Sequence, residues 1–128
     1  MNSMFTKIVR IALGLALVVF GANMIHSFIP MDHPDLASRA GQFMNSLSAT
    51  GYIFPVVGFL EVIIGAMLLL KKWVAFALIL LAPITINILL FHLFLDIPGM
   101  SLLIAVSVLV FNAILIFKHW QQYRPLFY

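Results

Sequence analysis

The amino-acid sequence predicts an all-α integral membrane protein: a bundle of four transmembrane helices with a short amphipathic interfacial helix between the first and the second. Hydrophobic residues make up 64% of the 128 residues and charged residues only 9%, whereas soluble domains are about half apolar and about a quarter charged. The apolar residues fall in four runs, at about 8–28, 52–70, 73–95 and 100–120. As a helix, each run covers roughly 30 Å, the thickness of a bilayer core. We therefore expect one membrane domain over residues 1–128.

The first apolar run is expected to remain in the mature protein as a helix. Lys7 and Arg10 precede it, as basic residues precede the apolar core of a signal peptide. The run is too long for such a core, however, and no small-residue cleavage site follows it. Three further apolar runs in the same chain also favour a membrane-spanning helix.

The charged residues predict the orientation in the membrane. One set of helix ends carries six basic residues: Lys7, Arg10, Lys71, Lys72, Lys118 and Arg124. The other set carries only Arg39, together with Asp32, Asp35 and Asp96. By the positive-inside rule, both termini are expected in the cytoplasm.

Two classes of function are excluded by the composition. The basic residues are scattered over helix ends and form no stripe, so a nucleic-acid partner is not expected. The chain has no cysteine, which rules out disulfides, cysteine-ligated clusters and thiol electron relays.

The connection Ile29–Thr50 is the only long one. Pro30 ends the first helix, and Pro34 is placed to open a short helix with Asp32 or His33 as its cap. Apolar residues then recur at helical spacing: Leu36, Ala40, Phe43, Met44 and Leu47. We expect a helix at the outer membrane interface, either as a lid over the bundle or simply resting among headgroups.

Glycines predict how the first two spanning helices pack. Gly14 and Gly21 are seven residues apart, as are Gly58 and Gly65, and such positions allow close backbone approach in membranes. Glu61 shares the face of the second pair, so it is expected to point into the bundle or a subunit interface. Because no basic residue lies at its depth, Glu61 is expected to be protonated or hydrogen-bonded through asparagine or water.

Each spanning helix supplies a polar residue to the middle or outer zone. Counting from the helix ends, Glu61 and Asn87 both lie roughly 12–14 Å below the outer surface. Asn23 lies shallower on the first helix, and Asn112 somewhat deeper on the fourth. These side chains form either a polar floor that binds a ligand such as a quinone or carries protons, or interhelical hydrogen bonds worth about 0.6 kcal/mol each.

Histidines add a second candidate group near the outer surface. His26 and His92 both lie about one turn below it, and Thr85, His92 and Asp96 share one helix face, which would let Asp96 orient His92. Two facing histidines could ligate a haem or, together with His33, a metal ion. The alternative is two interfacial histidines in contact with headgroup water.

Pro83 decides whether these groups meet. It removes one backbone hydrogen bond within the third span and is expected to bend that helix. Asn87 and His92 lie about 140° apart on an ideal helix, so both face the interior only if the bend rotates the outer half.

Three patterns resemble the DoxX/DoxD-like family of small bacterial membrane proteins. They are Gly14…Phe20-Gly21, Gly58-x-x-Glu61-x-x-x-Gly65, and Ala82-Pro83…Asn87…Phe91-His92-Leu93-Phe94-Leu95-Asp96. The resemblance implies a four-helix bundle in the bacterial cytoplasmic membrane, and some relatives are linked to thiosulfate:quinone oxidoreductase or membrane redox complexes. Many relatives carry a lysine where this chain has Met24, so a basic partner for Glu61 is missing at that place.

Together, the residues and the resemblance predict an accessory subunit of a quinone-linked redox system rather than a stand-alone enzyme. It would work as a homo-oligomer or within a larger membrane complex. The alternative is a non-catalytic scaffold or assembly partner, whose polar residues only hold helices together. A third possibility is a small-solute or proton transporter, which would need an oligomer because four helices are few.

Overall fold

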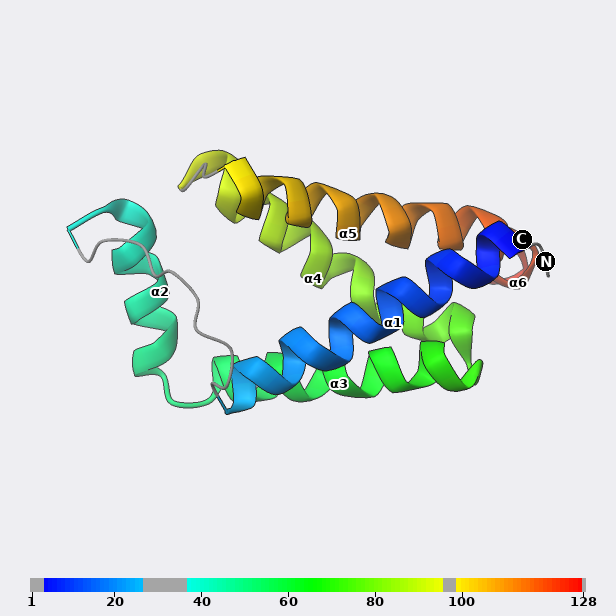
Figure 1. Ribbon diagram of the computed structural model, residues 1–128, viewed down its shortest axis with the longest axis horizontal. Coiled ribbons are helices and arrows are strands. Elements are labelled where there is room, and N and C mark those ends of the chain that lie inside the picture. The colour runs from blue at the N-terminus through cyan, green and yellow to red at the C-terminus, as the bar shows by residue number, and fades with distance from the viewer. Residues whose placement is uncertain (1–3, 27–36, 96–98, 128) are drawn as a thin grey trace.

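The computed structural model describes residues 4–26, 37–95 and 99–127, and within these residues the chain is helical with no strand. The long helices are α1 (Met4–Ile25), α3 (Ile53–Leu70), α4 (Val74–Phe94) and α5 (Gly99–Lys118). Three short elements complete the order: α2 (Arg39–Ala49), α6 (Trp120–Tyr123) and the 3-10 turn η1 (Arg124–Leu126). Figure 1 shows the long helices side by side, with both termini at one end and α2 at the other. We call these the termini end and the α2 end.

Helices α1, α3 and α4 are each long and apolar enough to cross a membrane. A fourth crossing is added if α5 and the short C-terminal helical segment, which are bent relative to each other, count as one span. The chain thus has the three to four apolar helices of a multi-pass membrane protein. These helices correspond to the four apolar runs of the sequence.

Helices α1 and α3 form an antiparallel pair with glycines face to face. A Cβ atom added to Gly21 would lie 2.7 Å from the carbonyl oxygen of Gly58, and one added to Gly65 would lie 2.7 Å from that of Gly14. The seven-residue spacing is the same on both helices, so the contact repeats after two turns. The two backbones touch directly, which is the close approach that small residues permit.

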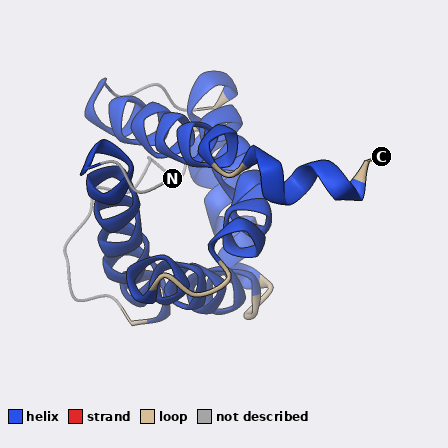
Figure 2. Cartoon of the chain, turned by 90° about the vertical axis from the view of Figure 1, so that its right-hand side faces the viewer, coloured by secondary structure: helices blue, strands red, loops and turns tan. Residues whose placement is uncertain are grey.

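Helices α4 and α5 form the second antiparallel pair. In addition, α1 contacts α5 and α3 contacts α4, so the four long helices close a ring in the order α1, α3, α4, α5 (Figure 2). Each long helix therefore packs against two other long helices.

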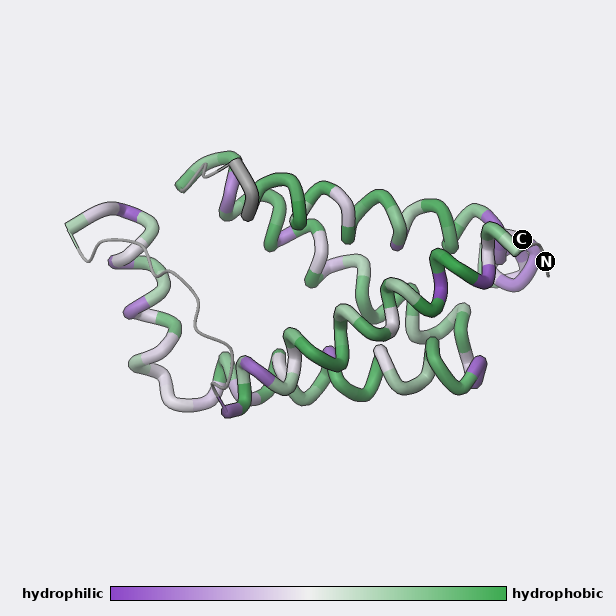
Figure 3. The backbone as a smooth tube through the Cα atoms, viewed as in Figure 1, coloured by the Kyte–Doolittle hydropathy of each residue, from purple (hydrophilic) through white to green (hydrophobic). Residues whose placement is uncertain are grey.

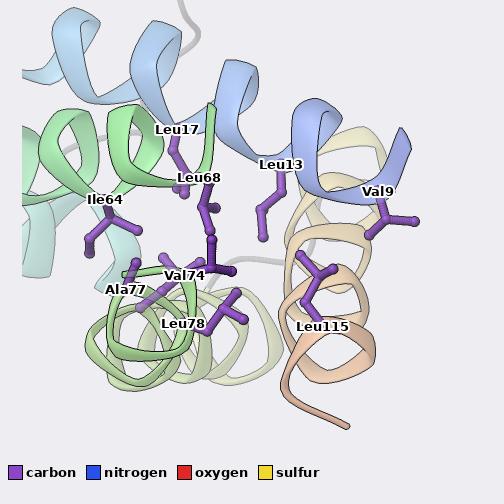
Figure 4. Close-up of a cluster of buried hydrophobic side chains, with 10 residues drawn as sticks. Val9, Leu13, Leu17, Ile64, Leu68, Val74, Ala77, Leu78 and Leu115 are labelled. Carbon is purple, nitrogen blue, oxygen red and sulfur yellow. The ribbon is translucent and has the colours of Figure 1, made fainter. Parts of the chain in front are cut away.

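A buried apolar core lies between the long helices (Figure 4), and its residues belong to the parts of those helices nearest the termini end (Figure 1). Its members come from all four long helices: Val9, Leu13, Leu17, Ile64, Leu68, Val74, Ala77, Leu78, Leu81 and Leu115. Towards the α2 end, the α1–α3 and α4–α5 pairs diverge (Figure 1). The four helices are therefore tied together mainly at one end.

Large apolar side chains also cover the outside of the molecule, and Figure 3 shows hydrophobic colour along every long helix. Phe59 and Leu103 are each 60% exposed, and Phe76 is 55% exposed. Such an apolar surface is compatible with the hydrocarbon core of a bilayer. Helices also suit that environment because their backbone N–H and C=O groups are hydrogen-bonded within the helix.

Helix α2 begins at Arg39 and lies across the α2 end (Figure 1). Ser38 caps it, since the Ser38 hydroxyl accepts the backbone N–H of Gly41 at 3.0 Å. The described helix thus starts later than a start at Pro34 would place it; Asp32, His33 and Pro34 themselves lie outside the described residues. The ring of Phe43 lies 5.8 Å from that of Phe91, which joins α2 to α4.

At the termini end, a tight turn joins α3 to α4. Lys71 and Trp73 have positive φ angles of 57° and 52°, in the left-handed region that normally favours glycine. The N–H of Lys72 donates to the carbonyl of Met67 at 2.9 Å, which closes the last turn of α3.

After α5 the chain bends by 70° into the C-terminal segment, which we define as α6 and η1, residues 120–126. Tyr123 is buried, and its hydroxyl donates to the carbonyl of Ala75 at 2.7 Å, which holds this segment against the first turn of α4. Burial raises the pKa of Tyr123 to about 12, so the phenol remains a donor at neutral pH.

Candidate functional site

Glu61 lies buried between α3 and α1, with 4% of its surface exposed. Its Cβ atom is 2.8 Å from the position that a Cβ on Gly21 would occupy. The acid therefore packs on bare backbone of α1, and it reaches this position because it shares the helix face of Gly58 and Gly65. The sequence predicted this face correctly.

No hydrogen bond or ion pair of the Glu61 carboxyl is found among the described residues. Met24, which stands where a lysine would be expected in the DoxX/DoxD-like pattern, packs its Cβ against Gly58 instead. Asn23 is buried on α1 in the same half of the molecule. Glu61 is thus an acid in an apolar helix pair, without a basic neighbour in the described part of the chain.

Arg10 is the buried basic residue of α1, but its described hydrogen bond is to a backbone carbonyl of α3 and not to Glu61. Its guanidinium donates to the backbone carbonyl of Leu68, in the last turn of α3. Arg10 precedes Gly21 by eleven residues, which places it roughly 16 Å away along α1. It therefore stabilises the C-terminal end of α3 and does not neutralise Glu61.

Thr85 and Asn112 join α4 to α5 through hydrogen bonds. The Thr85 hydroxyl lies 3.1 Å from Oδ1 of Asn112, and Nδ2 of Asn112 donates to the carbonyl of Leu78 at 3.2 Å. Both side chains are 1% exposed. Their polar atoms are engaged within the α4–α5 pair, which is the helix-packing role that the sequence left as an alternative.

Asn87 is not brought to Glu61. It is exposed, and its Nδ2 donates to the carbonyl of Pro83 at 2.8 Å on its own helix. Helix α4 continues through Pro83, so the proline does not turn the outer half enough to bury Asn87. No described contact joins Asn87 to Glu61; Glu61 lies in one helix pair and Thr85 with Asn112 in the other.

The histidines occupy separate places. His26 is exposed just after α1, and His92 is half-buried, with its ring edge-on to Phe91 at 5.2 Å. The Nδ1 atom of His92 is buried and has no hydrogen-bond partner in the described part of the chain. His33 and Asp96 lie outside that part, and the described residues contain no group of three metal-ligating side chains of the His, Cys, Asp or Glu type.

Two cavities open on the surface of the helices. One of about 250 Å³ lies between α1 and α5, with Ala12, Ala16 and Phe20 facing Leu103, Ser107 and Phe111. The other, of about 350 Å³, lies between α4 and the C-terminal segment. Neither is lined by Glu61, Asn87 or His92. These two cavities therefore lie away from Glu61, Asn87 and His92.

Two polar contacts were missed in the sequence. The predicted role of Arg10 is that of a basic residue at a helix end, but its spacing of four and eleven residues from Gly14 and Gly21 puts it on the buried face. Tyr123 follows the last predicted span and contacts Ala75, 48 residues earlier. No local pattern links those two positions.

Comparison with known proteins finds no matching family model, no matching curated protein and no matching solved structure. The resemblance to the DoxX/DoxD-like family thus rests on the sequence patterns alone.

Proposed function

We propose that this chain is a DoxX-like membrane protein that crosses the bacterial cytoplasmic membrane four times, with both termini in the cytoplasm and α2 at the outer interface. The placement of both termini and of the Lys71-Lys72 turn at one end supports this topology (Figure 1). The 20 residues of α5 cover about 30 Å, which is enough for the fourth crossing.

We further propose that it acts as an accessory subunit of a quinone-linked membrane redox system and that Glu61 is its functional group. The observation that carries this proposal is that Glu61, a residue only 4% exposed in the glycine-lined α1–α3 pair, has no described hydrogen bond or ion pair. Placing an acid at the centre of a membrane helix costs about 3 kcal/mol on insertion scales. Ionisable residues in such positions are by default functional.

The contrast with α4 and α5 supports the same assignment. Thr85 and Asn112 are equally buried, but they satisfy each other and the Leu78 carbonyl, so packing accounts for them. Packing does not account for Glu61, whose carboxyl contributes no described bond between helices. A protonated carboxyl there would donate to the carbonyl oxygen of a quinone, or to a polar group of another subunit.

A second candidate function is that of an assembly partner without a ligand, and Asn87 favours it. Its amide lies on the exposed face of α4 and satisfies only one of its donors on its own helix. An amide on the outer face of a spanning helix suits a neighbouring protein helix better than lipid. In this case α4 would be the contact surface.

The two functions separate in one experiment. The protein is purified in mild detergent as wild type, Glu61→Leu and Asn87→Leu, and each sample is analysed for quinone by mass spectrometry and for co-purifying membrane proteins. A quinone that is present in wild type and Asn87→Leu but absent from Glu61→Leu supports the redox proposal. A quinone-free wild type whose stoichiometric partner is lost in Asn87→Leu supports the assembly function and contradicts the role of Glu61.

A further inference from the structure

The cavity of about 350 Å³ at the termini end is a groove between α4 and the C-terminal segment. Trp73, Phe76 and Ile79 line it from α4, and Gln122, Tyr123 and Leu126 line it from the C-terminal segment. The lining is therefore largely apolar and aromatic, with one amide. None of these residues is used by the function proposed above.

The groove has a fixed wall. The bond from the Tyr123 hydroxyl to the Ala75 carbonyl, at 2.7 Å, holds the C-terminal segment against α4. The rings of Trp120 and Phe127, at the two ends of the segment, stack with their centroids 6.2 Å apart. Figure 2 shows this segment projecting sideways from the bundle, and its 70° bend from α5 gives it a direction across the helix axes.

The depth of the groove in the bilayer follows from these elements. Seven residues after the bend cover roughly 10 Å, too short to cross a bilayer, so on the four-crossing topology proposed above, on which this inference rests, we place the segment along the membrane surface. Trp73 is 77% exposed, and Trp and Tyr are the side chains that collect at headgroup level. Phe76 and Ile79 then extend from this level towards the hydrocarbon.

The charged residues that adjoin the elements of the groove in the sequence are all basic. Lys72 directly precedes Trp73, Lys118 ends α5, and Arg124 directly follows Tyr123. The four acidic residues of the chain are elsewhere, at Asp32, Asp35, Glu61 and Asp96. None of them lies within ten residues of Lys72, Lys118 or Arg124 in the sequence. Of these, Lys72 is exposed directly beside the lining residue Trp73, where its charge would complement an anion.

We propose that the groove between α4 and the C-terminal segment binds an anionic phospholipid, with its phosphate at Lys72 and an acyl chain along Phe76 and Ile79. An apolar slot with a basic rim at the cytoplasmic surface is the chemistry that recognises acidic headgroups between membrane helices. The amide of Gln122 offers a further donor to the headgroup. A zwitterionic lipid would fill the slot but gain nothing from the rim.

The protein carries its own reporters for this site. It has two tryptophans, Trp73 in the groove and Trp120 in α6. The variant Trp120→Phe keeps a ring opposite Phe127 and leaves Trp73 as the only emitter. Reconstituted into phosphatidylcholine bilayers, it is titrated with brominated phosphatidylglycerol or with brominated phosphatidylcholine, and quenching of Trp73 gives the relative association constant of the two lipids.

We expect brominated phosphatidylglycerol to quench Trp73 well beyond its mole fraction. Adding Lys72→Gln lowers the relative association constant about five-fold, the effect of one basic residue near an anionic headgroup. Lys7→Gln removes the same charge from an exposed position on α1 outside the groove and leaves the preference unchanged. Equal quenching by the two lipids overturns the proposal, and so does an equal loss in the Lys72 and Lys7 variants, which indicates a general surface potential.

Discussion

At the scale of single residues, the buried polar groups differ in where their hydrogen bonds go. Thr85 and Asn112 form a pair across α4 and α5, Arg10 binds the end of α3, and Tyr123 binds the start of α4. Each of these groups ties one helix to another within the chain. Glu61 forms no such bond in the described part of the protein, and this difference is the reason for assigning it a role outside the chain.

The Asn112 contact can be tested by Asn112→Ala. The variant leaves the Thr85 hydroxyl and the Leu78 carbonyl without this partner and opens space in a fully buried site. We expect the free energy of unfolding to fall by about 1–3 kcal/mol, as for a buried donor or acceptor that loses its partner. The measurement is unfolding in mixed micelles with increasing dodecyl sulfate.

Ser107→Ala is the matched control, because Ser107 is exposed and its hydroxyl donates to the Leu103 carbonyl of its own helix. It should change stability by less than about 0.5 kcal/mol. If both variants unfold alike, the Thr85–Asn112 contact does not hold α4 to α5.

At the scale of helices, α1 and α3 behave as one unit because their backbones touch at two glycine pairs. We expect Gly21→Ala to destabilise the protein, since its new Cβ would meet both the Gly58 carbonyl and the Cβ of Glu61 below 3 Å. Overpacking of this kind costs about 1–3 kcal/mol. Thermal unfolding in detergent checks it. Val19→Leu, which adds a methylene on the exposed face of α1, should unfold like wild type; a tolerant Gly21→Ala would mean that the two helices separate easily.

The sequence predicted helices better than contacts. Apolar runs ending at Lys71-Lys72 and at Pro98-Gly99 were sufficient to place α3, α4 and α5, because helix length in a membrane follows from hydropathy. Glycine spacing predicted that Glu61 points into the bundle or a subunit interface, and the structure places it against Gly21 of α1. The direction of Asn87 depended on how far Pro83 rotates α4, and the contact of Tyr123 with Ala75 depended on a bend after Lys118. The direction of Asn87 and the Tyr123–Ala75 contact both depend on packing between segments that are far apart in the sequence, so no local sequence pattern predicts them.

At the scale of the whole molecule, the arrangement predicts which surfaces are reached from each side of the membrane. The chain has no cysteine, so single cysteines can be introduced without background. In intact cells, we expect a membrane-impermeant maleimide to label Ser46→Cys in α2 and to spare Lys7→Cys and Lys72→Cys. The latter two should react only after the membrane is permeabilised. Labelling of Ser46 and Lys72 from the same side would contradict the four-crossing topology.

The uneven core also has a mechanical consequence. Because the shared apolar cluster lies at the termini end, the α1–α3 and α4–α5 pairs are held together at that end and diverge towards the α2 end (Figure 1). The 250 Å³ hollow lies between α1 and α5, and at the α2 end the two pairs are bridged by α2, which contacts α3 and packs Phe43 against Phe91 of α4. We therefore expect any change in the width of the molecule under lateral pressure to be larger at the α2 end than at the shared core.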